Sequence, residues 1–231
     1  MLRDLKSSVI AVVVLTLVFG LAIPALFTGF AQLAFSSQAD GSLIKANGKV
    51  VGSRLAAQAF TKPQYFHERP SATAPPYNAG ATTFANLGPT NSDLAKAVKT
   101  QAAAILKLER PYNPGLTTHG IPVDAVTTSG SGIDPDISPA YAQLQARRVA
   151  AVRHLPLAKV QQLIDDNTDG RSLGFFGEPG VNVLKLNIAL DKSQGKEWHE
   201  PLRASSRAIW SSRRSAIRSR SSTRANRCAT R

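Results

Sequence analysis

The chain has 231 residues, enough for one domain of ordinary size and a membrane segment. Its single cysteine, Cys228, excludes an internal disulfide and a Cys-x-x-Cys metal or redox site. The net charge of +13 would suit nucleic-acid binding, but +8 of it lies in residues 195–231, so the charge does not characterise the chain as a whole.

The first predicted element is a membrane-spanning helix. No side chain between Lys6 and Asp40 is charged, and residues 9–30 are almost all apolar. As a helix this segment would rise about 33 Å, which is enough to cross the hydrocarbon core of a bilayer. We therefore expect a short N-terminus over residues 1–8 and a single transmembrane helix over residues 9–35.

A cleavable signal sequence is the alternative for this segment, with Ser37-Gln38-Ala39 as the cleavage site. Its apolar core would normally be about 7 to 15 residues long, so the length favours an uncleaved anchor. Arg3 and Lys6 precede the span, and Asp40 is the first charge after it. The positive-inside rule then places the N-terminus in the cytoplasm and the rest of the chain outside.

A hairpin and a long loop follow the span. Asn47-Gly48 lies between two short apolar runs, a pattern typical of a type I′ turn. Residues 61–89 are rich in Pro, Thr, Ala, Asn and Gly, and a loop of this length is usually functional or a linker. Its aromatic side chains offer apolar area to bury, which argues against a linker.

Helices and strands then alternate irregularly. Helical patterns recur at residues 93–108, with Ser92 as the predicted cap, at 139–153, capped by Ser138, and at 157–167. Residues 122–129 are predicted to form a strand, and residues 181–190 a strand followed by a helix. Because there is no regular βαβ repeat, we expect a mixed α+β domain over residues 36–193.

The sequence offers little support for a catalytic or metal site. Ser129 and Ser131 do not lie in a G-x-S-x-G elbow, so a hydrolase is only an alternative. Asp134 and Asp136 could ligate calcium, but the pattern of an EF-hand is absent and an Asp-Pro turn explains them as well. Gly130-Ser131-Gly132 lacks the lysine of a phosphate-binding loop. We therefore expect no catalytic residue and no metal.

The segment 194–231 is rich in arginine and serine and poor in apolar residues, which predicts disorder. It is either a basic arm for phosphates or anionic lipid, or an accidental extension such as a frameshifted gene end, and we favour the second. Only Trp198 and Trp210 could stack on bases there, so no nucleic-acid partner is expected.

Seven short motifs occur in a fixed order behind the predicted span: DGSLI (40–44), GS (52–53), YFHERPSA (65–72), NLGPTN (86–91), SGSGIDP (129–135), RVA (148–150), and GEP with VNVL (177–184). In this order they resemble the C subunit of the Kdp-type potassium-transporting P-type ATPases, from about residue 1 to 193. The segment 194–231 has no counterpart in that family.

The resemblance implies a non-catalytic subunit of a pump in the bacterial inner membrane. The other subunits would be a channel-like potassium-binding subunit and an ATP-hydrolysing P-type subunit, with membrane lipid around the helix. The family is described as stabilising the assembly and as a catalytic chaperone that raises the pump's affinity for ATP. The alternative is a membrane-anchored periplasmic binding module or hydrolase unrelated to potassium.

The topology conflicts with direct contact to ATP, because ATP is cytoplasmic and the domain should face the periplasm. Coupling across the membrane through the span, or the opposite orientation, would resolve the conflict. We favour an extracytoplasmic cap near the potassium entrance, with no tightly bound cofactor and ATP acting only through the complex.

Two segments are the candidate sites. The first is a partner contact that combines aromatic and charged side chains, or a loop pinned by its own aromatics onto the helices beneath it: Tyr65, Phe66, His67, Arg69, Tyr77 and Asn78. The second is the loop that carries the family motif: Ser129, Gly130, Ser131, Gly132 and Asp134.

Overall fold

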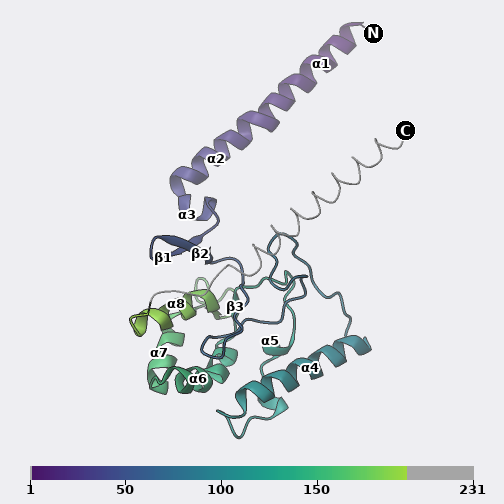
Figure 1. Cartoon of the computed structure of the whole chain (residues 1–231). Helices are drawn as coiled ribbons and strands as arrows, with labels where there is room; N and C mark the ends of the chain where they lie inside the picture. Colours follow the sequence, from purple (N-terminus) through teal and green to yellow (C-terminus); the bar gives the residue numbers. More distant parts are fainter. Residues whose placement is uncertain (1, 197–231) are drawn as a thin grey trace, which may run out of the picture. The chain divides into compact units, whose positions relative to one another are not determined.

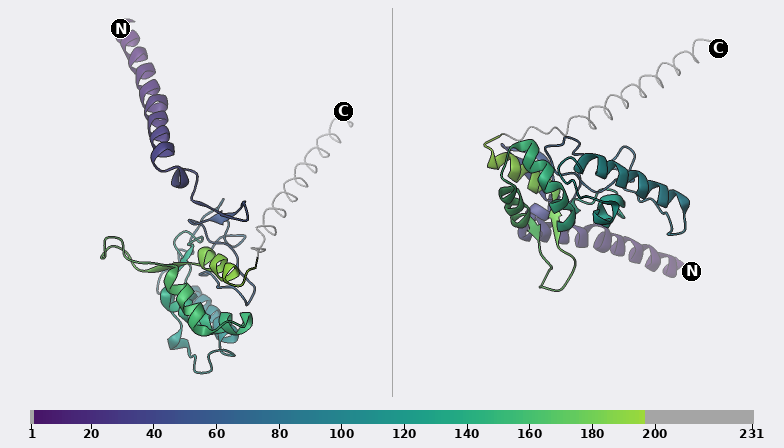
Figure 2. Two further views of the ribbon diagram at one scale, coloured as in Figure 1. Left: turned by 90° about the vertical axis from the view of Figure 1, so that its left-hand side faces the viewer. Right: turned by 90° about the horizontal axis from the view of Figure 1, so that it is seen from below.

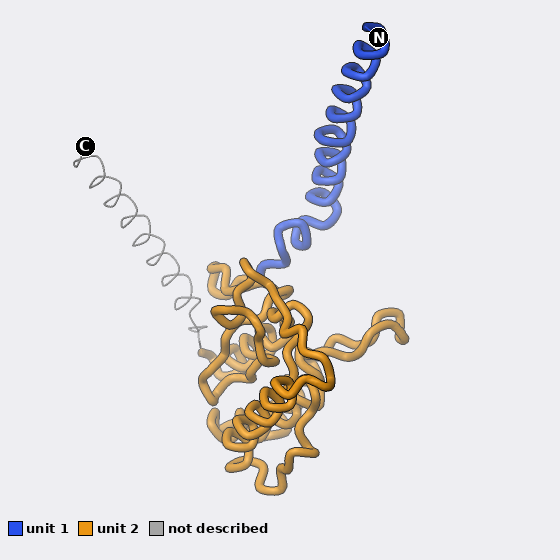
Figure 3. Tube along the Cα trace, turned by 90° about the vertical axis from the view of Figure 1, so that its right-hand side faces the viewer, with its two compact units in different colours: residues 1–43 blue, residues 44–231 orange. Residues whose placement is uncertain are grey.

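The computed structural model describes residues 2–196 (Figure 1). The chain divides into two compact units, residues 1–43 and residues 44–231 (Figure 3). Most of the segment 194–231, from residue 197 onward, lies outside the described residues, so the prediction made for it stays a prediction.

The first unit is a long apolar helix. It consists of α1 (Leu2–Leu17), a π-helical turn (Val18–Ala22) and α2 (Ile23–Ala34). Together they form a 33-residue helix with a mean hydropathy of 2.8, long and apolar enough to cross a membrane. The predicted apolar helix is therefore present with the length and composition of a membrane span, and the helix begins closer to the N-terminus than residue 9. A short helix, α3 (Ser36–Ala39), follows it.

The π-helical turn has a cause in the sequence. Pro24 has no backbone N–H, so it cannot continue the ladder of hydrogen bonds between residues four apart. The N–H of Ile23 instead bonds to the carbonyl of Val18, five residues back. The helix thus passes the proline with one widened turn.

The second unit begins with a hairpin. Strands β1 (Leu43–Ala46) and β2 (Lys49–Ser53) form a two-stranded sheet. Between them Asn47 and Gly48 have φ values of 50° and 73°. Two consecutive positive φ angles define the type I′ turn that the sequence predicted.

The predicted helices form with small corrections at their ends. Helix α4 (Ser92–Glu109) is capped by Asn91, not by Ser92, because the Asn91 side chain accepts a hydrogen bond from the Asp93 N–H at 2.8 Å. Helix α6 (Pro139–Arg153) has the predicted cap, since the Ser138 side chain accepts from the Tyr141 N–H. Helix α7 (Leu157–Asp166) follows after a short connection.

The predicted strand over residues 122–129 is wrong. A short helix, α5 (Val123–Val126), lies there, after a 3₁₀ turn (Thr118–Gly120). The Asp124 carboxylate accepts hydrogen bonds from both the N–H (2.7 Å) and the hydroxyl (2.9 Å) of Ser138. This tie holds α5 at the start of α6, and tertiary contact thereby outweighs the strand propensity of valine and threonine.

A small antiparallel sheet supports the C-terminal half of the domain. Its strand order is β3 (Asp136–Ile137), β5 (Gly180–Asn182), β4 (Thr168–Asp169). Ile137 and Thr168 both pair with Val181 of the central strand. Helix α8 (Val183–Ser193) continues directly from β5, which confirms the prediction of a strand followed by a helix.

The core lies among α6, α7 and α8, which lie side by side in Figure 1. The long loop 61–89 forms no helix or strand, and it contributes Tyr65 and Phe66 to this core. Helix α4 is more peripheral, and of its apolar side chains only Ile105 is buried. The domain is mixed α+β, as the sequence predicted.

Candidate functional site formed by two loops

Residues 63–78, here called the pinned loop, are held on α6 and α8 by two side-chain amides. Asn187 accepts a hydrogen bond from the Phe66 N–H at 2.9 Å and donates one to the Phe66 carbonyl at 3.0 Å. Gln145 does the same for His67, at 2.8 and 3.1 Å. Each amide supplies the donor and the acceptor that a neighbouring strand would supply. The loop can therefore be buried without belonging to a sheet.

A fully buried arginine completes this attachment. Arg148 on α6 donates to the Glu109 carboxylate at 2.8 Å and to the backbone carbonyls of Pro63 and Tyr65. It also donates to Gln145 at 2.8 Å. A buried guanidinium needs partners for its donors because it keeps its charge. Arg148 thus joins α4, α6 and the pinned loop.

A second buried arginine lies under the Tyr65 ring, 4.7 Å from its centroid. Arg153 donates to Asp191 at 2.7 Å and to the carbonyl of Gln64 at 2.6 Å. Tyr65 donates its hydroxyl proton to the same carboxylate at 3.0 Å. Burial, and then the negative charge of Asp191, raise the pKa of Tyr65 to about 12, so the phenol keeps this proton.

These contacts correct one part of the partner-contact prediction. Tyr65 is 4% exposed and Phe66 is 0% exposed, so both side chains belong to the core and not to a contact surface. The alternative, a loop pinned by its own aromatics, describes them. Of the other predicted contacts, His67, Arg69, Tyr77 and Asn78, all are partly exposed.

His67 is a titratable residue of the pinned loop with a partly exposed side chain. Burial, and then the positive charge of Arg148, lower its pKa to about 4. The ring is therefore neutral near pH 7. Its Nε2 lies 3.0 Å from the carbonyl of Lys62, which can only accept a hydrogen bond, so Nε2 carries the proton.

The structure brings the two predicted segments together. Residues 129–136, here called the glycine loop, contact the pinned loop although about 60 residues separate them in the sequence. Arg69 pairs with Asp134 at 2.8 Å, and the Ser71 hydroxyl donates to the carbonyl of Gly132 at 2.6 Å. The Tyr77 hydroxyl donates to the carbonyl of Arg69 at 2.9 Å. The two loops form one continuous structure.

Glycine is required at one position of this junction. Gly132 has a φ of 71°, and a Cβ there would lie 2.7 Å from the carbonyl oxygen of Thr83 and 2.8 Å from Thr73. The serines of the glycine loop have local partners: the Ser129 hydroxyl accepts from the Gly132 N–H and the Ser131 hydroxyl from the Ile133 N–H. These serines shape a turn.

Glu68 is a buried acid next to this junction. It is only 5% exposed. Burial, and then the charges of Asp134 and Asp136, raise the pKa of Glu68 well above its usual value. In residues 2–196 no group of three or more His, Cys, Asp or Glu side chains could hold a metal ion.

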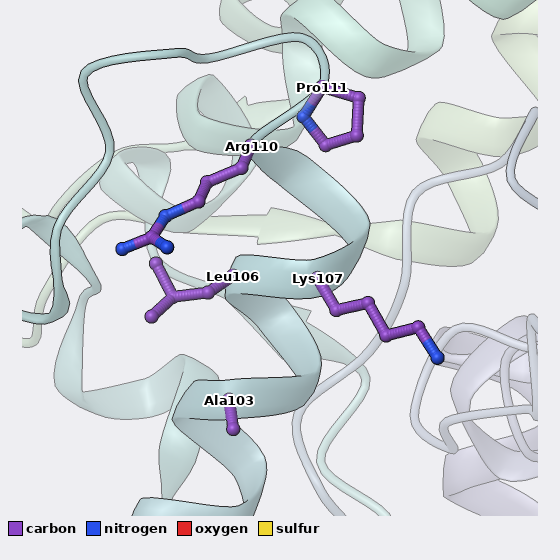
Figure 4. Close-up of a pocket in the computed structure, with 5 residues that line it drawn as sticks. All are labelled: Ala103, Leu106, Lys107, Arg110 and Pro111. Carbon is purple, nitrogen blue, oxygen red and sulfur yellow. The ribbon is translucent and has the colours of Figure 1, made fainter.

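Two hollows lie on the surface of the second unit. One, of about 500 Å³, is lined by residues 84–88 and 127–130 together with Leu94. The other, of about 570 Å³, lies along the end of α4 beside Ala103, Leu106 and Pro111. In it Lys107 and Arg110 point away from each other (Figure 4), so they do not converge on an anion.

The sequence analysis missed the side chains that hold the pinned loop. They are polar residues on the buried faces of α6 and α8, where apolar residues would be expected: Gln145, Arg148, Arg153, Asn187 and Asp191. One of them, Arg148, falls in the RVA motif quoted above. A charged or amide side chain at a core position of a predicted helix is the signal that could have found them.

Comparisons with known proteins cover both units. The family model described as "K+-transporting ATPase, c chain" (KdpC) matches residues 5–192. The chain is 49% identical over 191 residues to the potassium-transporting ATPase KdpC subunit of Beijerinckia indica, covering 83% of this chain and 94% of that protein. It is 52% identical over 192 residues to that of Caulobacter sp. strain K31 (83% and 94%) and 51% identical over 192 residues to that of Methylococcus capsulatus (83% and 98%).

Proposed function

Because the chain belongs to the KdpC family, the c chain of K+-transporting ATPases, we propose that it is a membrane-anchored, non-catalytic subunit of a potassium uptake pump. The observation that supports this most strongly is that the family match includes both the apolar helix and the domain. Its partners would be a channel-like potassium-binding subunit and an ATP-hydrolysing P-type subunit, with membrane lipid around the helix. Its task would be to stabilise their assembly.

The anchor is the helix of residues 2–34, in the bacterial inner membrane. Its charged side chains, Arg3, Asp4 and Lys6, all lie at one end. By the positive-inside rule this end stays in the cytoplasm and the domain lies in the periplasm. The geometry of the domain suits a rigid cap, because buried ion pairs and amides hold its long loop in one conformation.

The proposed location also limits how the subunit could affect ATP. A periplasmic domain cannot touch cytoplasmic ATP, so a catalytic-chaperone effect on ATP affinity would have to be transmitted through the membrane helix. We propose that the domain caps the potassium entrance and binds no cofactor tightly by itself. Any increase in ATP affinity would be a property of the whole complex.

Purification of the tagged full chain in mild detergent tests this function, from cells grown at micromolar potassium. We expect two larger membrane partners and potassium-stimulated ATP hydrolysis in the eluate. A chain recovered alone would contradict the proposal if a variant that stops after Gln194, and therefore lacks the basic tail, is also recovered alone.

Protease treatment of intact spheroplasts tests the orientation separately. With the domain in the periplasm, added protease should cut within residues 36–193, and the exposed residues 79–86 offer an accessible site. Cleavage only after lysis would place the domain in the cytoplasm and would exclude the cap.

A further inference from the structure

The segment between β4 and β5 exposes an unusual amount of apolar surface. Every residue from 170 to 178 is exposed. Leu173 is 83% exposed, Phe175 64% and Phe176 59%. Figures 2 and 3 show this segment projecting from the rest of the second unit. We call residues 171–178 the apolar tip. Contiguous exposed apolar side chains of this size mark an interaction surface.

The apolar tip has a defined conformation of its own. Ser172 and Phe176 exchange two backbone hydrogen bonds of 2.9 Å each. Arg171 pairs with Glu178 at 2.8 Å across the base, and the rings of Phe175 and Phe176 pack with centroids 4.2 Å apart. These contacts fix the tip before it meets a partner, which lowers the entropy lost on binding.

Leu173, at the apex of the tip, is a residue type that such a turn disfavours. Leu173 and Gly174 have φ values of 54° and 83°, a pair of positive angles that favours Asn, Asp or Gly. A leucine in the left-handed region is strained. Strain of this kind is found where a side chain serves a function. Leu173 therefore indicates that an apolar apex is required for something other than folding.

Charge decides which partner fits the apolar tip best. Residues 168–180 contain one base, Arg171, and two acids, Asp169 and Glu178. Lys185 lies 3.7 Å from Asp169 and balances it. Binding to an anionic bilayer depends on an excess of Lys and Arg around the apolar residues, and this tip has none. A neutral, rigid apolar knob fits an apolar recess on a protein.

We propose that the apolar tip docks into an apolar recess on the channel-like potassium-binding subunit of the same pump, because the proposed function places the domain over the potassium entrance. This inference rests on the proposed function and names the surface that performs it. On its C-terminal side the tip is joined to the core, because Val181 and Val183, which follow it in the chain, are both 0% exposed. Docking of the tip therefore fixes the whole domain on its partner.

Photo-crosslinking of the full chain within the pump tests the contact directly. A photoreactive amino acid replaces Phe175 in the tagged chain, which is expressed together with the pump's other subunits. The control carries it at Val123, which is 74% exposed elsewhere on the domain. We expect a covalent adduct with the potassium-binding subunit from position 175 and none from position 123. An adduct with the ATP-hydrolysing subunit, with lipid or with a second copy of this chain, or no adduct at all, would overturn the proposal.

Serine substitutions measure how much the contact contributes. The tip variant is Leu173→Ser/Phe175→Ser/Phe176→Ser, and its matched control is Leu55→Ser/Phe84→Ser/Val123→Ser, three other exposed apolar residues. We expect the tip variant to retain roughly tenfold less of the larger subunits after detergent purification, because hot-spot residues dominate such contacts. The control should match the wild type, and circular dichroism should show both variants folded.

The outcomes separate this inference from the proposed function. If the wild type purifies with the pump and the tip variant does so equally well, the tip is not the docking element and the proposed function stands. If the wild type does not purify with the pump, both fail.

Discussion

Two pairs of adjacent aromatic residues, Tyr65-Phe66 and Phe175-Phe176, have opposite environments in this domain. Both pairs lie in loops rich in glycine or proline. The first pair is 4% and 0% exposed, and the second is 64% and 59% exposed. The pinned loop and the apolar tip therefore show that an aromatic pair by itself does not distinguish a core anchor from a docking element.

The difference between them lies in the polar groups supplied from elsewhere in the chain. Burying Tyr65-Phe66 requires partners for the loop backbone, and Asn187, Gln145 and Arg148 provide them. The apolar tip satisfies its own backbone across a hairpin, so it needs no core and can project. The side chains of Phe175 and Phe176 can therefore remain exposed and bind a partner.

The largest expected effect comes from truncating one aromatic of each pair. Phe66→Ala should lower the free energy of unfolding by about 3–5 kcal/mol, because it removes a fully buried ring and leaves a cavity. Phe176→Ala should change it by less than about 0.5 kcal/mol. Urea titration of the full chain in mild detergent, followed by circular dichroism, measures both. Equal effects would remove the distinction between the two loops.

The second prediction concerns the amide that holds Phe66. Asn187→Leu should lower the free energy of unfolding by about 1–3 kcal/mol, because the N–H and carbonyl of Phe66 lose their partners while buried. Gln161→Leu is the control. The Gln161 side chain is exposed, and the hydrogen bond that it donates to Gln143 is long, at 3.4 Å. The same urea titration measures both variants. If the control lost as much unfolding free energy as Asn187→Leu, the proposed role of Asn187 in holding Phe66 would be contradicted.

The smallest expected effect is a pH dependence from His67. Its folded pKa of about 4 lies below the unfolded value of 6.5, so between these values the unfolded chain binds the extra proton. The stability that neutral His67 contributes is complete above pH 6.5 and is lost progressively as pH falls toward 4, and roughly 1–2 kcal/mol of it is lost between pH 7 and pH 5. Glu68 acts in the opposite direction, because its folded pKa is raised.

The measurement is therefore a difference between variants. Thermal melting of wild type, His67→Gln and His119→Gln is compared between pH 7 and pH 5. His67→Gln should lose less stability on acidification than the wild type, and His119→Gln, which changes an exposed side chain, should follow the wild type. Parallel behaviour of all three proteins would show that His67 is not the group responsible.

Local sequence patterns predicted most helices and the first hairpin, because caps and turns depend on a few neighbouring residues. Ser138-Pro139 fixes the start of α6 and Asn47-Gly48 fixes the turn between β1 and β2. Residues 122–129 misled the prediction, since Asp124 bonds to Ser138 and holds a helical turn where the local propensity favoured a strand. The predicted cap of α4, Ser92, was wrong by one residue, because the adjacent polar residue Asn91 is the cap.

The sequence alone established the apolar helix and the order of motifs that the KdpC family shares, since both are properties of the linear chain. Only the tertiary structure decided which loop is buried. That outcome depends on Arg148 and Asn187, which are about 80 and 120 residues from the loop in sequence and reach its backbone only after α6 and α8 have packed. Hydrogen bonds over such separations leave no local pattern, so the burial of Phe66 and the exposure of Phe175 followed from packing.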